Sequence, residues 1–462
     1  MQIKYGERME YHVDFFSEGE VKNPLFKGEF LENHFVVDSG KGITTFMVGM
    51  GKEFEERNQI KEVYAAAVKE MKKYRIKEFS CDIAQVMKGY GEEALRDIVE
   101  GLILGEYEPE HFPAREKYEC TVSLTGGRWT KEQEQVVQEM ISVLQGVMLA
   151  RDMVNKPANM LRPSDFVREI SEFMKGLPIE IVVFSKDELE EMGMAGLLMV
   201  GGSSTFPPYL FVMRYLPKKE GPITGLVGKG VTCDTGGYCI KPAGSMEGIK
   251  GDMAGGAAVA GAVFALAKNE IMENVVAVIP MCENKIAPDA YIPGDVITSY
   301  SGKTIEVLNT DAEGRLILAD AISYAVQNEQ TERIVDIATL TGAVAVALGG
   351  QVAGTLSQNE EFYQKFQKAF ETSGERYHRL PWYREHETMI KSTIADVKNV
   401  GGNYSGSITA GLFLKRFVED RPWIHLDIGG TASVDPPLFA YQSKGATGAG
   451  VTSLYYLCKK GF

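Results

Sequence analysis

The side chains most able to do chemistry in this 462-residue chain gather between residues 227 and 316. Lys229 and Asp234 follow an apolar run, in a stretch whose glycines let the backbone turn sharply. Asp252 precedes a Gly/Ala-rich segment, and Asp311 and Glu313 stand just before another apolar run. With two further basic residues, the candidates are Lys229, Asp234, Lys241, Asp252, Asp311, Glu313 and Arg315.

The four carboxylates among these candidates point to metal binding if they lie close together in the fold. Their mutual repulsion would raise their pKa values unless cations neutralised them. Two divalent ions would balance four carboxylates, and two-metal hydrolytic sites hold their ions roughly 3.5–4 Å apart. Oxygen-rich ligation suits Mg, Mn or Zn. Each side chain alone could equally be a surface charge, a helix cap or half of a salt bridge, so the prediction is that the set converges.

The elements that would position these residues alternate between strand and helix after about residue 150. Several of the apolar runs are continuous, as in strands that are covered on both faces. Predicted strands cover residues 179–184, 209–215, 223–227, 275–280, 304–308, 334–338 and 423–427. Predicted helices cover 257–268, 316–326, 360–372 and 410–418. We expect a helix-flanked, mostly parallel or mixed α/β sheet whose ligands bind beyond the carboxyl ends of the strands.

The chain is longer than one hydrophobic core usually serves, which predicts two domains. Residues 1–150 are predicted to form a smaller α/β domain for packing or assembly, with strands at 42–50 and 117–124. Residues 151–462 are predicted to form the larger, catalytic domain. A long helix at about 131–154 is expected to link the two.

Composition narrows the class of protein. The net charge of −14 argues against a protein built to hold nucleic acid or an anionic membrane, and it favours cationic partners. We expect no secretory signal at the N-terminus and no membrane span, because no apolar stretch is long enough. The six cysteines form no CxxC pair, which suits a reducing cytoplasm. A cytoplasmic enzyme is therefore expected.

The cluster resembles a known family. Residues 309–316, Asn-Thr-Asp-Ala-Glu-Gly-Arg-Leu, reproduce the signature octapeptide of the leucyl aminopeptidase (cytosol aminopeptidase) family of two-metal exopeptidases. The blocks at 228–237, Lys241 and Asp252-Met253 match in the same order, and the resemblance covers roughly residues 150 to 455. Enzymes of the family remove N-terminal residues from peptides. Ile249 departs from the family pattern, since some members have a Met there that lines the side-chain pocket.

The resemblance implies a ligand set for two divalent ions in each subunit. Asp234 and Glu313 would be shared by both ions, while Asp311 completes one site and Asp252 and Lys229 complete the other. Lys229 would have to be neutral to donate its lone pair, so an adjacent ion must lower its pKa. Mn or Zn is the expected metal, with Mg or Co as alternatives.

The resemblance also implies how the reaction runs. A water that bridges the ions would attack the carbonyl of the first peptide bond, and the ammonium of Lys241 would stabilise the oxyanion. Arg315 would hold a bicarbonate that carries the proton. The backbone that lines the substrate cleft would come from Asn309, Ala312, Thr339, Leu340 and Gly342. Members of the family commonly assemble as homohexamers.

Three functions follow as hypotheses. The first is a broad-specificity aminopeptidase that prefers apolar residues such as Leu. A dedicated dipeptidase would differ from it in how turnover depends on peptide length. A DNA-binding or assembly role, as in some bacterial members of the family, would need a basic surface, which the acidic composition argues against. No histidine lies in the cluster, which argues against a histidine-zinc protease.

Overall fold

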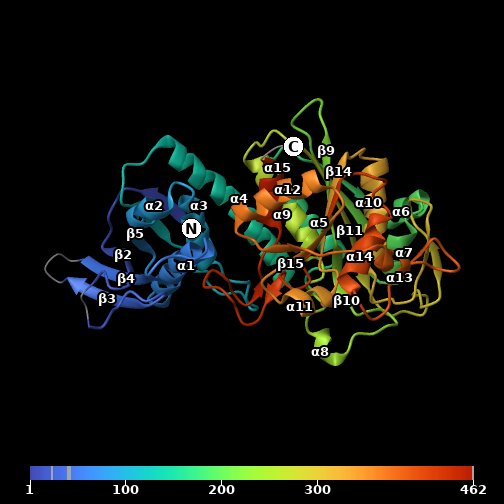
Figure 1. Cartoon of the computed structure of the whole chain (residues 1–462), viewed down its shortest axis with the longest axis horizontal. Helices are drawn as coiled ribbons and strands as arrows, with labels where there is room; N and C mark the ends of the chain where they lie inside the picture. The colour runs from blue at the N-terminus through green and yellow to red at the C-terminus, as the bar shows by residue number, and fades with distance from the viewer. Residues whose placement is uncertain (22–23, 39–42, 460–462) are drawn as a thin grey trace. The chain divides into compact units, whose positions relative to one another are not determined.

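The computed structural model of the chain describes residues 1–21, 24–38 and 43–459. The chain forms two compact units, which can be followed by colour in Figure 1. The first comprises Met1–Leu144 with Asp435–Lys444, and the second comprises Gln145–Val434 with the chain from Gly445 on. The division falls within α4, Lys131–Asn155, the long helix expected from the sequence. The predicted α/β class, with a smaller N-terminal and a larger C-terminal part, is confirmed.

The first unit is a sheet packed with helices. Its strands are β1 Gln2–Tyr5, β2 Tyr11–Ser17, β3 Asn33–Asp38, β4 Ile43–Gly51, β5 Glu78–Asp82 and β6 Thr121–Thr125. The helices are α1 Asn58–Lys73, α2 Ala84–Tyr90 and α3 Ala94–Glu106. The order is β1-β6-β5-β2-β4-β3, with β3 antiparallel to β4 and the other neighbours parallel in the described part of the chain. The strand expected at 42–50 is β4, and Gly42 lies outside the described residues.

A segment from late in the sequence, Asp435–Lys444, packs with the first unit. The Ala440 amide donates to a carboxylate oxygen of Glu62 at 2.9 Å, and the Lys69 ammonium donates to the Gln442 carbonyl at 2.7 Å. The expectation of a single division near residue 150 did not include this segment. Its partners on α1 lie 378 and 373 residues earlier in the chain, beyond the reach of local sequence patterns.

The second unit is built on a mixed sheet. Its strands are β7 Glu180–Phe184, β8 Tyr209–Tyr215, β9 Ile223–Gly228, β10 Gly230–Asp234, β11 Asn274–Asn284, β14 Arg333–Ala338, β15 Ala353–Ser357, β16 Tyr377–Arg379 and β18 Trp423–Asp427. The order is β16-β15-β18-β14-β9-β11-β8-β7, and β10 pairs with the far end of β11. Strands β11, β9, β14 and β18 are parallel neighbours, flanked by the antiparallel pairs β18–β15 and β11–β8.

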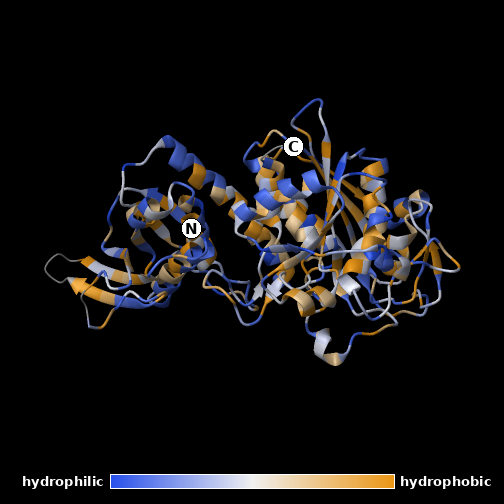
Figure 2. Ribbon diagram, viewed as in Figure 1, coloured by the Kyte–Doolittle hydropathy of each residue, from blue (hydrophilic) through white to orange (hydrophobic). Residues whose placement is uncertain are grey.

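Helices cover both faces of this sheet, as Figure 1 shows for α9 and α10. The helices are α5 Pro163–Phe173, α6 Lys186–Met192, α7 Ala195–Gly201, α8 Ala243–Met246, α9 Ala254–Lys268, α10 Gly314–Gln327, α11 Gly342–Leu348, α12 Glu360–Ser373, α13 Arg384–Met389, α14 Gly406–Lys415 and α15 Val451–Lys459. The central strands are mainly hydrophobic in Figure 2, and all of β11 is buried. The helix-flanked mixed sheet expected from the sequence is confirmed. No helix in the described ranges is long and apolar enough to cross a membrane.

Two small sheets lie outside the main sheet of the second unit. They are β12 Val296–Thr298, β13 Thr304–Glu306 and β17 Val397–Lys398 in one group, and β19 Ser433–Val434 with β20 Gly445–Ala446 in another. The sequence did not reveal β15, which is buried and pairs with β18. Its residues, Ala-Gly-Thr-Leu-Ser, lack the run of β-branched and aromatic side chains that marks a strand, and the pairing is decided by its neighbours.

Helices α4 and α9 cross at a pair of glycines. A Cβ on Gly146 would lie 2.3 Å from the carbonyl oxygen of Gly261, and a Cβ on Gly261 would lie 2.5 Å from that of Gly146. Both distances are shorter than carbon and oxygen atoms tolerate without displacement. The two helices therefore approach at a spacing that only glycine permits at this crossing.

Replacing one of these glycines tests that spacing. Gly146→Ala should lower the melting temperature, because overpacking typically costs about 1–3 kcal/mol, more than the roughly 1 kcal/mol that alanine gains over glycine in a helix. Scanning calorimetry would measure the shift. Gly244→Ala in α8 is the control, since its Cβ would meet nothing within 4 Å. An unchanged melting temperature for Gly146→Ala would show that the helices can part without cost.

Candidate metal centre

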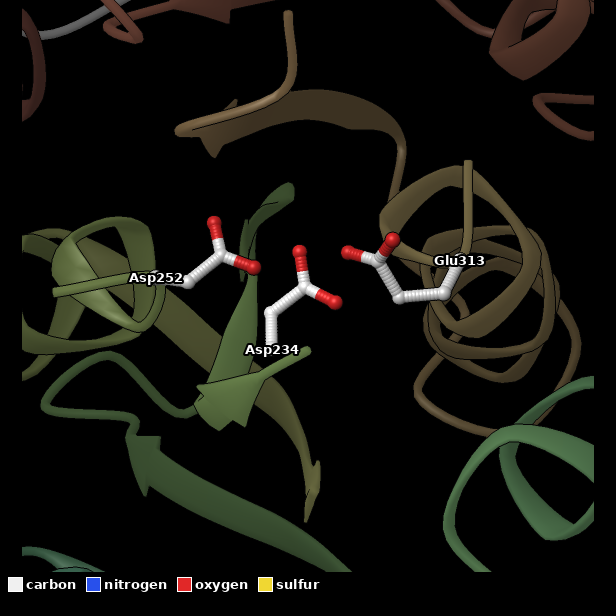
Figure 3. Close-up of side chains that lie close together, drawn as sticks. All are labelled: Asp234, Asp252 and Glu313. Atoms are coloured by element: carbon white, nitrogen blue, oxygen red, sulfur yellow. The ribbon is translucent and has the colours of Figure 1, made fainter. Parts of the chain in front are cut away.

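Three of the predicted carboxylates converge at one end of the mixed sheet. Asp234 is the last residue of β10, Asp252 lies in the loop before α9, and Glu313 directly precedes α10. One carboxylate oxygen from each lies within 4.8 Å of the others. Figure 3 shows the three carboxylates pointing toward one another from these separate elements. Residues from three stretches of sequence thus form one acidic cluster.

Backbone contact between β9 and α9 places Lys229 beside Asp252. A Cβ on Gly228, the last residue of β9, would lie 2.6 Å from the Gly255 carbonyl oxygen. A Cβ on Gly255 would lie 2.0 Å from the carbonyl oxygen of Ile337 in β14. The helix can begin this close to the sheet only because these positions carry no side chain. Lys229 directly follows Gly228, and Asp252 lies three residues before Gly255, so this close approach brings the two side chains within reach of each other.

Lys229 forms ion pairs with two members of the cluster. Its ammonium nitrogen lies 2.7 Å from the Asp252 carboxylate and 2.8 Å from Glu313 Oε1, and it also donates to the Thr339 carbonyl at 3.1 Å. The side chain is only 4% exposed. Gly314 leaves it room, since a Cβ there would lie 2.5 Å from the Lys229 Cε.

Lys241 connects the cluster to the fourth carboxylate. Its ammonium lies 2.7 Å from Asp234 Oδ2 and also forms an ion pair with Asp311. Asp311 lies outside the group of three converging carboxylates and joins it through this lysine. The structure therefore brings together all five residues predicted to ligate metal, and it adds Lys241 between two of them.

Burial shifts the pKa values of these groups. Burial, followed by repulsion from Glu313, raises the pKa of Asp234 to about 6 even though the lysines oppose this. Burial also raises the pKa of Asp252 and of Asp311. For Glu313, burial would raise the pKa, but the ammonium of Lys229 outweighs it and the pKa is lowered. Burial thus disfavours the charged form of Asp234, Asp252 and Asp311, and the neighbouring ammonium groups offset this effect only in part.

For the two lysines, ion pairing has a larger effect on the pKa than burial has. Burial alone would lower the pKa of Lys229 and of Lys241. The surrounding carboxylates, Asp252 foremost for Lys229 and Asp234 for Lys241, outweigh burial and raise both pKa values above the usual range of lysine. Each ammonium therefore compensates the carboxylates it touches.

Asn284 holds Asp234 in place, a role that the sequence did not suggest. In the parallel pairing of β10 with β11, Asn284 lies opposite Asp234. Its amide donates to Asp234 Oδ1 at 2.8 Å and to the Thr310 carbonyl at 2.9 Å, and the Gly236 amide donates to the same Oδ1 at 2.9 Å. The predicted strand at 275–280 stopped short of this residue. Extending it to the polar end of the strand would have found Asn284.

Arg315 is buried behind the cluster. The residue is 6% exposed, and its Nη1 donates to the Asn399 carbonyl at 2.6 Å. Its Nε finds no hydrogen-bond partner within the part of the chain that the structure describes. Burial lowers the pKa of Arg315 to about 10, and Glu313 and Asp427 oppose that shift only partly. A buried guanidinium donor without a partner carries a desolvation cost that a hydrogen-bond acceptor would relieve.

The cluster opens into a cleft of about 300 Å³. Around the charged groups it is lined by Val154, Ser245, Gly248, Ile249, Gly251, Thr339, Leu340, Thr341, Gly342, Gly429, Ala432 and Ser433. Thr339, Leu340 and Gly342, predicted to line the substrate cleft, are among them. Asn309 and Ala312 are not, and they lie in the loop that carries Asp311 and Glu313. A larger cavity, about 640 Å³, lies beside α13 and α14 and contains none of the predicted site residues.

The chain is similar to proteins of one family along most of its length. The catalytic domain of the cytosol aminopeptidase family matches residues 148–455, and the N-terminal domain of that family matches residues 37–115. A probable cytosol aminopeptidase of Clostridium perfringens is 40% identical over 423 residues, covering 90% of this chain and 86% of the relative. One of Treponema denticola is 39% identical over 468 residues, covering 99% and 97%.

A solved structure shares the fold. The bottromycin maturation enzyme BotP in complex with Mn gives a TM-score of 0.90 at 29% identity, covering 98% of this chain and 99% of that one. The two-part α/β fold and these matches define the class as an aminopeptidase, a hydrolase of peptides. The chain belongs to the cytosol aminopeptidase family, as the octapeptide at 309–316 predicted.

The acidic cluster predicts tight binding of divalent ions. After treatment with chelator, Mn²⁺ should bind the protein and raise its melting temperature, because the ions relieve the repulsion among the carboxylates. Asp252→Asn should weaken Mn²⁺ binding by at least about 10–100-fold, the loss that follows removal of even an outer partner of a metal ligand. Isothermal titration calorimetry would measure both. Glu247→Gln, an exposed acid nearby, is the control and should bind like the unaltered protein.

Proposed function

We propose that this chain is a two-metal aminopeptidase that hydrolyses the first peptide bond of peptides, with broad specificity and a preference for apolar N-terminal residues. One observation carries the proposal. Five groups from three separate stretches, the four carboxylates and Lys229, lie together at the end of the sheet where α/β folds bind ligands. The family to which the chain belongs supports the peptidase chemistry.

The residues present fit a pair of divalent ions. Oxygen donors of Asp234, Asp252, Asp311 and Glu313, with the amine of Lys229, would hold the ions, and Glu313 Oε2 is buried with no hydrogen-bond partner among the described residues. Mn or Zn is the first expectation, and the similar BotP structure is a complex with Mn. Bound there, such ions would supply Lewis acidity and would acidify a water molecule.

Lys241 is the group we assign to the oxyanion. Both lysines line the cleft, but the Lys241 side chain is 20% exposed, whereas that of Lys229 is only 4% exposed. Cations bound to Asp234 and Asp311 would weaken the ion pairs that now hold Lys241 and would leave its charge for the substrate. A fixed positive charge beside the carbonyl oxygen stabilises the negative charge that develops during attack.

Arg315 is the group we assign to a bicarbonate that shuttles the proton. The guanidinium is buried, carries a donor without a partner in the described chain, and is separated from Glu313 in sequence by one residue. A planar anion with two oxygens matches the fork of a guanidinium. Activity that rises with added bicarbonate in Arg315-intact protein, and not in Arg315→Ala, would support this role.

The cleft supports both the exopeptidase action and the apolar preference. The cluster carries net negative charge, which attracts the free amino group that only the start of a peptide offers. Apolar side chains of Val154, Ile249, Leu340 and Ala432 belong to the wall. They would favour an apolar first residue through burial, at roughly 25 cal/mol for each Å² removed from water.

Hydrolysis of leucyl-p-nitroanilide tests the proposal. Chelation should abolish the reaction, and Mn²⁺ or Zn²⁺ should restore it. Lys241→Ala should keep the metals but lose roughly 10²–10³-fold in kcat, the usual cost of removing one oxyanion donor. Lys268→Ala, at the exposed end of α9, is the matched control. Full activity in Lys241→Ala, at unchanged metal content, would rule out the role assigned to that lysine.

We also propose a homohexameric assembly in the cytoplasm. The family suggests the assembly, the names of the relatives suggest the location, and the second unit displays large apolar side chains. Val346 on α11 is 90% exposed and Tyr404, just before α14, is 81% exposed. Contiguous exposed apolar patches commonly mark contact surfaces, and α11 and α14, on or beside which the two residues lie, are in contact.

Light scattering after gel filtration tests the assembly. The expected mass is about six times the 50.9 kDa of the chain. Val346→Asp with Tyr404→Asp should reduce that mass, because a charged side chain is costly at a buried interface. Tyr383→Asp, another exposed aromatic, is the comparison. A monomer for the unaltered protein would exclude the hexamer.

A further inference from the structure

Asn399 lies where a short ladder ends and the signature loop begins. It follows β17, which pairs in parallel with β13, and its backbone amide donates to the Glu306 carbonyl at 3.0 Å. Glu306 is the last residue of β13. In the described part of the chain, residues 308–313 take part in no strand pairing, so the buried backbone groups of this loop need partners of another kind. Asn399 itself is fully buried.

The side-chain amide of Asn399 supplies those partners. Its Oδ1 accepts from the Leu308 amide at 2.8 Å and from the Asn309 amide at 3.4 Å. Its Nδ2 donates to the Asn309 carbonyl at 2.7 Å and to the Ala312 carbonyl at 3.4 Å. The oxygen faces donors and the nitrogen faces acceptors. A side chain with only donors or only acceptors would leave part of this set unpaired.

The backbone of the same residue holds Arg315. The Asn399 carbonyl accepts from Arg315 Nη1 at 2.6 Å, a short hydrogen bond assisted by charge. A single residue therefore fixes both the start of the loop, at Leu308 and Asn309, and the arginine that follows it. Asp311 and Glu313 lie between these two fixed points.

We propose that Asn399 is a positioning residue for the proposed aminopeptidase reaction: it holds the backbone at 308–312 and the Arg315 guanidinium in the geometry that the chemistry requires. The inference rests on the proposed function and goes beyond it, because Asn399 is neither a ligand nor a lining residue of the cleft. It acts through the loop, not on the substrate. A misplacement of reacting groups by about 1 Å costs on the order of 100-fold in rate.

Two substitutions test the role. Asn399→Ala removes every side-chain hydrogen bond. Asn399→Asp keeps the size and the acceptor but sets an oxygen against the carbonyl oxygens of Asn309 and Ala312. Asn274→Ala is the control. Asn274 is buried at the opposite end of β11 from Asn284, and its Oδ1 accepts a hydrogen bond from the Lys218 amide at 3.0 Å. Its loss removes a buried hydrogen bond without touching the signature loop.

Kinetics at saturating Mn²⁺ give the first measurement. Both Asn399 variants should lose about 100-fold in kcat with KM within about threefold. Asn274→Ala should keep kcat within twofold, even where its melting temperature falls as far as that of Asn399→Ala. If kcat of the Asn399 variants stays within twofold, or falls no further than in the control, the proposal is wrong.

Hydrogen exchange gives a second measurement that needs no activity. The amides of Leu308 and Asn309 should exchange faster in both Asn399 variants, while the β9 segment exchanges as in the unaltered protein. If the unaltered protein did not cleave leucyl-p-nitroanilide, the proposed function would fall. The exchange data would still decide the positioning role, which unchanged exchange at 308–309 would overturn.

Discussion

Charge compensation in a space with little water is the constraint on which the rest of the structure depends. Four carboxylates meet two ammonium groups around one cleft, which leaves two negative charges uncompensated. Burial makes isolated charges costly, so each carboxylate must have a cationic neighbour. Lysines provide these neighbours in the structure, and divalent ions can compete for the same oxygens. The same balance explains why burial and ion pairing act on each pKa in opposite directions.

The architecture serves this balance by bringing strand ends and helix starts into backbone contact. Gly228 and Gly255 allow α9 to begin against the sheet, and Gly314 allows the Lys229 side chain to pass. The parallel strands β9, β14 and β18 end at the same edge of the sheet. Polar residues that follow these strands therefore meet there. Local sequence and global fold agree at this edge, as expected of a sequence that folds to one structure.

The sequence was sufficient where the signal is local. Continuous apolar runs predicted β8, β9, β11, β14 and β18, and a specific octapeptide predicted the family. The sequence was insufficient where a residue's hydrogen-bond partner lies far away along the chain. Asn284 reaches Asp234 through strand pairing across 50 residues, and Asn399 reaches Leu308 across 91. Neither asparagine belongs to a motif, because a hydrogen bond between segments that are far apart in the sequence imposes no spacing along the chain. For the same reason, the sequence did not predict that Asp435–Lys444 belongs to the first unit.

The glycine contact between β9 and α9 also bears on how such enzymes can diversify. Any side chain at Gly228 or Gly255 would push the helix off the sheet and separate Lys229 from Asp252. These two positions, where backbone lies against backbone, are therefore closed to substitution. New substrate preferences would instead accumulate among the side chains that line the cleft, such as Ile249 and Leu340. A lineage could thus exchange its peptides repeatedly while inheriting the same hydrolytic apparatus.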